Sequence, residues 1–154
     1  MILMHNYYLL CKLGWSVIMF DWKKPTAQML GRWQPWHDGH TELFKKALAE
    51  TGQVCIMVRD VGGIIGEDAG AGRTVTQDDN PFEWKQVRQN IIAGLNKAGY
   101  LIGIDYEIMK VPNIVDISYG RGVGYTFTEH DLGEAIHNIS ATKIRAKMRE
   151  EGEL

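Results

Sequence analysis

Residues 26–52 read TAQMLGRWQPWHDGHTELFKKALAETG, a strand pattern, a loop and a helix pattern in direct succession. The opening TAQML is short and partly apolar, and it predicts a buried strand that ends at Gly31. Residues 31–40 hold one proline and two glycines, which predict a loop. From Thr41 the apolar residues recur at helical spacing until Gly52, so a helix is predicted between these two residues.

The rest of the chain continues this alternation. Further strands are predicted at 53–58, 104–111 and 114–118, further helices from Pro81 to near Gly99 and from Ser140 towards Glu151, a long loop at 61–80 and a glycine-rich turn at 120–124. The alternation predicts an α/β fold, a three-layer sandwich with a mostly parallel sheet covered on both faces. Such sheets bind ligands at the carboxyl ends of their strands, which is where residues 31–40 are expected.

Composition is that of an ordinary globular protein. Of the 154 residues, 45% are hydrophobic and 23% are charged, which suits one compact domain and excludes a disordered tail or a multi-domain machine. The formal net charge is −2, so neither nucleic acid nor an anionic membrane is an expected partner. Any phosphate that the protein binds must therefore be held by local residues.

Residues 1–24 are predicted to form an extension that precedes the main domain at 25–154. Their apolar runs are interrupted by Lys12 and Gly14 and follow no basic region, so neither a signal peptide nor a membrane span is expected. The extension is expected to pack on the domain or on a second subunit, which leaves a homo-oligomer open. Two cysteines are too few for a disulfide framework, and a cytoplasmic location is expected.

The motif His37-Asp38-Gly39-His40 lies where the first loop meets the first helix. Backbone N–H groups at a helix N-terminus favour an anion, and two imidazoles there add donors for phosphate oxygens. Gly39 has no side chain to keep a phosphate away from the backbone. Two other interpretations are open: a cap formed by Asp38 or Thr41 between surface histidines, and a metal site of His37, Asp38 and His40.

A second polar group opens the last helix, where residues 139–145 read ISATKIR. Ser140 is the predicted N-cap, and Arg145 lies within the first turns. Free N–H groups, two hydroxyls and a guanidinium would converge at this helix end and form a second phosphate site. A capped basic helix is the alternative interpretation.

These motifs resemble those of a known superfamily. Residues 31–40 resemble the signature loop of the HxGH nucleotidyltransferases, and residues 139–145 resemble the ISxTxxR motif of the same superfamily. The resemblance covers about residues 26–150. It implies a Rossmann-like domain that transfers a nucleotide from a nucleoside triphosphate to an acceptor and releases pyrophosphate.

Two further resemblances concern the substrates. Asn80-Pro81-Phe82 followed by Arg88 is similar to a helix opening in archaeal-type nicotinamide-mononucleotide adenylyltransferases. Residues 119–124 resemble the GRD-type turn of ATP sulfurylases, with Gly122 in place of the usual aspartate. ATP is therefore the favoured nucleotide and nicotinamide mononucleotide the leading acceptor, while a cytidylyltransferase, a sulfate adenylyltransferase-like enzyme and a non-catalytic nucleotide sensor stay open.

The resemblance also assigns roles to residues. It implies that His37 and His40 contact the triphosphate and that Arg145, with Ser140 and Thr142, holds the β- and γ-phosphates. Other nucleotide-binding candidates are Gly31, Arg32, Gln34, Gly39, Arg121 and Ile139, and candidates for acceptor binding are Trp36, Asn80 and Arg88. Mg²⁺ is expected to arrive with the triphosphate and to have few protein ligands, so no protein metal site is predicted.

Overall fold

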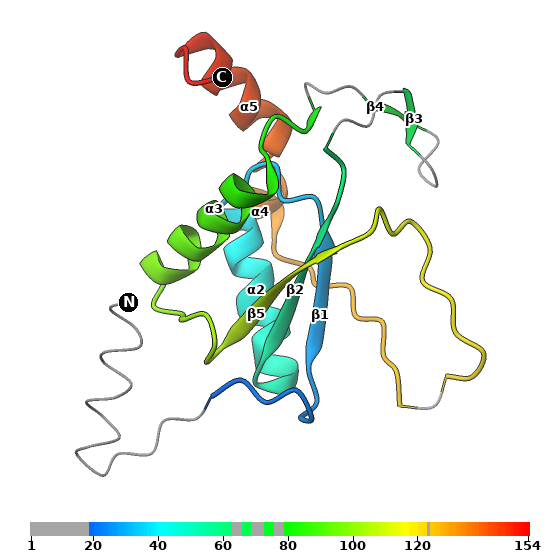
Figure 1. Cartoon of the computed structure of the whole chain (residues 1–154). Coiled ribbons are helices and arrows are strands. Elements are labelled where there is room, and N and C mark those ends of the chain that lie inside the picture. Colours follow the sequence, from blue (N-terminus) through cyan, green and yellow to red (C-terminus); the bar gives the residue numbers. More distant parts are fainter. Residues whose placement is uncertain (1–18, 63–65, 69–72, 76–78, 123) are drawn as a thin grey trace.

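The computed structural model describes residues 19–62, 66–68, 73–75, 79–122 and 124–154. The elements in chain order are β1 (Ala27–Gly31), α2 (Asp38–Thr51), β2 (Val54–Arg59), β3 (Gly66–Asp68), β4 (Arg73–Val75), α3 (Trp84–Lys97), β5 (Tyr106–Val111), α4 (Glu134–His137) and α5 (Ala141–Glu150) (Figure 1). The expected extension at 1–24 lies largely outside the described residues.

A three-stranded parallel sheet forms the centre of the fold, in the order β1-β2-β5. In the register, Met29 pairs with Ile56, and Ile56 pairs with Ile108. The first connection, β1–α2–β2, is the strand–helix–strand unit that residues 26–52 predict. The prediction of an α/β chain with a parallel sheet is therefore confirmed.

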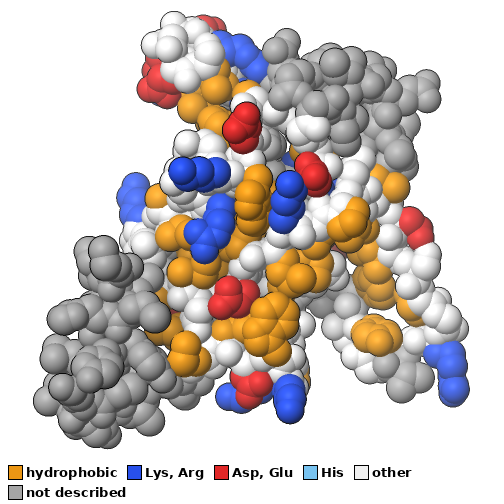
Figure 2. Space-filling view, in the orientation of Figure 1, with side chains coloured by type: hydrophobic (Ala, Val, Ile, Leu, Met, Phe, Trp, Pro, Cys, Tyr) orange, Lys and Arg blue, Asp and Glu red, His pale blue; other side chains and the backbone are white. Residues whose placement is uncertain are grey.

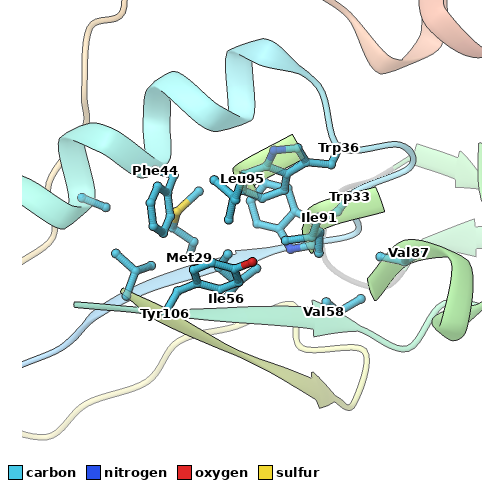
Figure 3. Close-up of a cluster of buried hydrophobic side chains, with 12 residues drawn as sticks. Met29, Trp33, Trp36, Phe44, Ile56, Val58, Val87, Ile91, Leu95 and Tyr106 are labelled. Atoms are coloured by element: carbon cyan, nitrogen blue, oxygen red, sulfur yellow. The ribbon is translucent and has the colours of Figure 1, made fainter. Parts of the chain in front are cut away.

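The hydrophobic core lies between this sheet and the helices α2 and α3. Ile56 of β2, Phe44 of α2 and Ile91 of α3 are fully buried in one cluster, which also contains Tyr106 of β5 (Figure 3). These residues follow the periods that the sequence predicts, every second residue on the strands and every third or fourth on the helices. Since α2 and α3 share one cluster, the two helices cover the same face of the sheet, and within the described residues they form one layer.

The prediction of a strand at 114–118 is wrong. Residues 112–122 and 124–133 contain no helix or strand, and the side chains of Val115, Ile117 and Tyr119 are exposed. Alternating apolar residues favour an extended conformation, but a strand also needs a neighbouring strand for its backbone hydrogen bonds, and no described strand pairs with this segment.

Smaller differences concern the ends of elements. The helix predicted from Thr41 starts three residues earlier, at Asp38, because His37 supplies an N-cap. The helix predicted from Pro81 starts at Trp84, with Glu83 as its N-cap residue. The long loop at 61–80 contains the antiparallel pair β3–β4. No helix in the described part of the chain is long and apolar enough to cross a membrane.

Candidate functional site

The loop between β1 and α2 is anchored in the core by its tryptophans. The indole N–H of Trp33 donates to the carbonyl oxygen of Met57 at 3.0 Å, although the backbone of Trp33 has a positive φ of 55°. The indole N–H of Trp36 donates to Thr41 Oγ1 at 2.9 Å. The left-handed backbone of Trp33 is unfavourable for a bulky residue, so the packing of the loop must hold Trp33 in this conformation.

His37 and His40 form a reciprocal cap at the start of α2. The backbone N–H of His40 donates to His37 Nδ1 at 3.4 Å, and that of His37 donates to His40 Nδ1 at 3.2 Å. The two rings stack with 3.6 Å between their centroids and an interplanar angle of 18°. Because both Nδ1 atoms accept hydrogen bonds, each neutral ring carries its proton on Nε2 and can donate only from there.

The surroundings keep both imidazoles neutral. Burial, and then the neighbouring His37, lower the pKa of His40 to about 3. Burial also lowers the pKa of His37, against the opposing effect of Asp38. The rings of Trp33 and Trp36 lie 4.8 Å and 5.3 Å from that of His40 and remove part of its surface from water. Near pH 7 the pair therefore offers two uncharged N–H donors at a helix N-terminus.

The histidine pair leaves no room for a side chain at residue 39. A Cβ at Gly39 would lie 2.9 Å from Cε1 of the His37 ring and 3.0 Å from its Nδ1. The His37 ring would have to move away from His40 to make room. The packing of the histidine pair is therefore by itself a reason for a glycine at this position, whereas the close approach of a phosphate stays a prediction.

Arg145 reaches the same loop from the last helix. The residue is 3% exposed, and Nη1 donates to the carbonyl oxygen of Gln34 at 2.7 Å across 111 residues of sequence. Nη2 donates to Thr142 Oγ1 at 3.3 Å and lies 3.5 Å from Asp79 Oδ1. Figure 1 shows α5 beyond the carboxyl ends of the strands. The two sequence motifs therefore meet at one edge of the sheet.

A third segment, residues 79–82, is held against the loop. The side-chain amide of Gln34 donates to the carbonyl oxygen of Phe82 at 2.9 Å and accepts the N–H of Phe82 at 2.9 Å. Arg32 Nη1 donates to Asn80 Oδ1 at 3.2 Å, and Asn80 is 1% exposed. Arg32, Gln34 and Asn80 are thus brought together, as a shared site requires.

Four other candidate site residues pack within the protein or lie at the start of the last helix. Trp36 is 7% exposed and packs against Gly94 of α3, where a Cβ would lie 2.7 Å from its ring, so it belongs to the core. Gly31 packs under the Trp33 ring, because a Cβ at this position would lie 2.8 Å from atoms of the ring. Ser140 is the N-cap residue of α5, but its side chain makes no capping hydrogen bond. The backbone N–H of Ile139 donates to the carbonyl oxygen of Ile136, whose Cγ2 lies 3.6 Å from the Cβ position at Gly39.

Two predicted arginines are exposed at the surface, unlike the buried Arg145. Arg88 is exposed on α3, whose outer surface also carries Lys85 and Lys97, and Figure 2 shows Lys and Arg side chains over this part of the molecule. Arg121 is exposed in the irregular segment after β5. Sequence reasoning missed Asp79, whose only signal is its position just before Asn80. Its carboxylate is the acidic group nearest to Arg145 among the ion pairs of the described residues.

Comparisons with known proteins add nothing to this geometry, because no family model, no curated protein and no solved structure matches the chain. Within the described ranges, no group of three or more His, Cys, Asp and Glu side chains could hold a metal ion. What the residues can do chemically is bind an anion: two imidazole donors and a helix N-terminus lie beside a buried guanidinium.

Proposed function

We propose that the protein is a nucleotidyltransferase of the HxGH type that transfers the adenylyl group of ATP to a small phosphorylated acceptor and releases pyrophosphate. One observation carries the proposal: Arg145 of the last helix donates to the backbone of Gln34, three residues before His37. Two motifs that each suit phosphate thus lie together although 111 residues separate their contact partners.

The reaction needs no protein nucleophile. An acceptor oxygen attacks the α-phosphorus, the bond from phosphorus to the bridging oxygen breaks, and pyrophosphate leaves on the opposite side. His37 and His40 would donate their Nε2–H groups to phosphate oxygens, where negative charge increases in the transition state. Because their Nδ1 atoms are fixed by the reciprocal cap, these donors are already oriented before the substrate binds.

Charge comes from Arg145 and from the metal of the substrate. Burial lowers the pKa of Arg145, with Asp79 opposing the change, yet a guanidinium keeps its proton at neutral pH. Ser140 and Thr142 stand beside it at the start of α5 and would hold the β- and γ-phosphates with it. Mg²⁺ would enter as part of the Mg·ATP substrate.

The finer description of the fold belongs to the same proposal. A Rossmann-like three-layer sandwich would carry a further layer over the face of the sheet that holds Leu30, Met57 and Met109. These three residues pair across the strands, and the buried cluster under α2 and α3 does not include them. Parallel sheets are normally covered on both faces, which supports a second covering layer.

Nicotinamide mononucleotide is the acceptor that we propose first. The support is the Asn80–Phe82 segment, which carries the sequence similarity to enzymes that use this acceptor and which Gln34 and Arg32 hold beside the nucleotide loop. An oxygen of another phosphate ester or of sulfate can attack the α-phosphorus in the same geometry, so the acceptor has to be identified by assay.

The test combines binding with turnover. Thermal unfolding of the full chain is followed with Mg·ATP and with Mg·CTP, since a ligand that binds only the folded state raises its Tm. Pyrophosphate release is then measured with nicotinamide mononucleotide, other phosphate esters and sulfate. A higher Tm with ATP and acceptor-dependent pyrophosphate support the proposal. No Tm shift and no pyrophosphate overturn it, and a Tm shift without pyrophosphate from any acceptor replaces the enzyme by a nucleotide sensor.

A further inference from the structure

Gln34 connects three segments that are far apart in the sequence. Its side-chain amide binds the backbone of Phe82, 48 residues away, and its carbonyl oxygen accepts from Arg145, 111 residues away. The residue is only 5% exposed. Both ends of this one residue are therefore occupied by the protein rather than open to a ligand.

The bond between Gln34 and Phe82 fixes an orientation as well as a distance. An amide that donates to a backbone carbonyl and accepts from the N–H of the same residue imitates the pairing of two strands. The N–H and the carbonyl group of Phe82, which belong to two successive peptide units, are thus both fixed by one side chain. Asn80, two residues earlier, is tied to Arg32 of the same loop. The segment 79–82 is thus attached to the loop at two points.

Arg145 closes the arrangement. Its guanidinium contacts both the Gln34 carbonyl, at 2.7 Å, and the Asp79 carboxylate, at 3.5 Å. Each pair among the loop, the segment 79–82 and α5 is therefore joined by at least one hydrogen bond or ion pair. In such a closed network each bond limits the freedom of the groups that form the others, so the loss of one link disturbs the rest.

We infer that Gln34 is a positioning residue of the phosphate site: without touching the ligand, it aligns the segment 79–82 and the guanidinium of Arg145 with the loop that carries His37 and His40. The inference rests on the proposed function for its catalytic consequence. A displacement of about 1 Å in a positioned group can lower a rate by about 10²-fold. Loss of the Gln34 amide should therefore act on turnover more than on substrate affinity.

The first experiment replaces Gln34 by a side chain of similar length that forms no such hydrogen bonds, Gln34→Met. Hydrogen exchange of the Phe82 amide is measured in the ligand-free protein, and pyrophosphate release is measured with Mg·ATP and the acceptor. We expect Phe82 exchange at least about 10-fold faster and kcat lower by about 10- to 100-fold, with KM for ATP changed less. The matched control is Gln86→Met, where an exposed amide on α3 donates to Asn90, and it should change neither value.

A second variant, Gln34→Glu, keeps the test valid where Gln34→Met fails to fold. A protonated glutamic acid can accept the Phe82 N–H and donate its O–H to the Phe82 carbonyl, whereas the carboxylate can only accept. Burial raises the pKa of a carboxyl group at this position and the neighbouring Arg145 guanidinium lowers it. The bond should be present below the resulting pKa and lost as pH rises through it. Phe82 exchange, corrected for its intrinsic pH dependence, should accelerate over this range in Gln34→Glu alone.

The outcomes separate this inference from the proposed function. If the wild-type chain neither binds ATP nor releases pyrophosphate, the proposed function fails, while the exchange of the Phe82 amide still tests the alignment. Unchanged Phe82 exchange in both variants overturns the inference. A variant with faster Phe82 exchange but wild-type kcat overturns it too, because the alignment would then have no part in the reaction. A KM for ATP that rises with kcat unchanged assigns Gln34 to ligand contact instead.

Discussion

The rings of His37 and His40 stack with 3.6 Å between their centroids, and each Nδ1 accepts the backbone N–H of the other residue. The same two side chains therefore start helix α2 through their Nδ1 atoms, and their Nε2–H groups take no part in the cap. A helix cap and an anion-binding site are two alternative interpretations that the sequence leaves open for the motif at 37–40. At α2 the cap orients the donors that the site would use.

Replacing His37 by asparagine should separate these two roles. Asparagine is among the best N-cap residues, so its side chain can accept the His40 N–H and the free energy of unfolding should change by less than about 1 kcal/mol. The Nε2–H donor is lost, and we expect turnover to fall by about 10²- to 10³-fold. Chemical denaturation and pyrophosphate release measure the two effects on one preparation. Turnover within a factor of three of wild type would remove His37 from the catalytic residues.

Stability should depend on pH through His40. Its folded pKa of about 3 lies below the ordinary value of 6.5, so between these values the unfolded chain binds more protons than the folded one. The contribution of His40 to the free energy of unfolding should therefore have its full value above about pH 6.5. It should decrease as pH falls towards 3, by at most about 1.4 kcal/mol per pH unit. Urea denaturation of wild type and His40→Gln from pH 7 to pH 4 tests the sign. The variant should have the shallower slope, and parallel slopes would contradict a neutral buried imidazole.

Much of this arrangement is predictable from the sequence because it depends on local patterns. The apolar spacing around Phe44 predicts α2, the continuous apolar run around Ile56 predicts a buried strand, and the motif at 37–40 marks the helix start. These features need information from only a few neighbouring residues. The class of fold follows from their order along the chain.

Other features depend on contacts between distant residues, which local patterns do not encode. Trp36 beside a glycine-containing loop suggests a ligand platform, but its place in the core follows from Gly94 on α3, which leaves room for the indole. The alternation at 114–118 predicts a strand without naming a partner, and none of the described strands pairs with it. The link from Gln34 to Phe82 spans 48 residues and involves backbone atoms that any residue would provide.

Gly39→Ala should disturb the histidine pair without a change of charge. The added methyl group would lie 2.9 Å from the His37 ring, so the ring must leave its stacked position. Alanine favours a helix by about 1 kcal/mol over glycine, which offsets part of the strain. We therefore expect a Tm close to that of wild type but ATP affinity lower by about 10-fold or more, measured by calorimetric titration. Gly62→Ala is the control, since the nearest atom to its Cβ position outside its chain neighbours is Asp60 Oδ1, at 4.0 Å. Equal ATP affinity in both variants would show that the stacked geometry is not needed.

Asp79 is expected to compete with the substrate for Arg145. Its carboxylate lies 3.5 Å from Nη2, and it is the more accessible partner, with its side chain 38% exposed against 4% for Arg145. A triphosphate that approaches this guanidinium must replace the carboxylate or accept its repulsion. Asp79→Asn should therefore bind Mg·ATP several-fold more tightly at low ionic strength, and the gain should shrink as salt screens the charge.

Arg145→Lys is expected to have the opposite effect. A lysine ammonium cannot contact the Gln34 carbonyl, Thr142 and a phosphate in one planar geometry, so the ATP affinity of this variant should fall by about 10-fold or more. Titration of both variants at two salt concentrations decides the matter: weaker ATP binding by Asp79→Asn would mean that the carboxylate orients Arg145 for the nucleotide rather than opposing it.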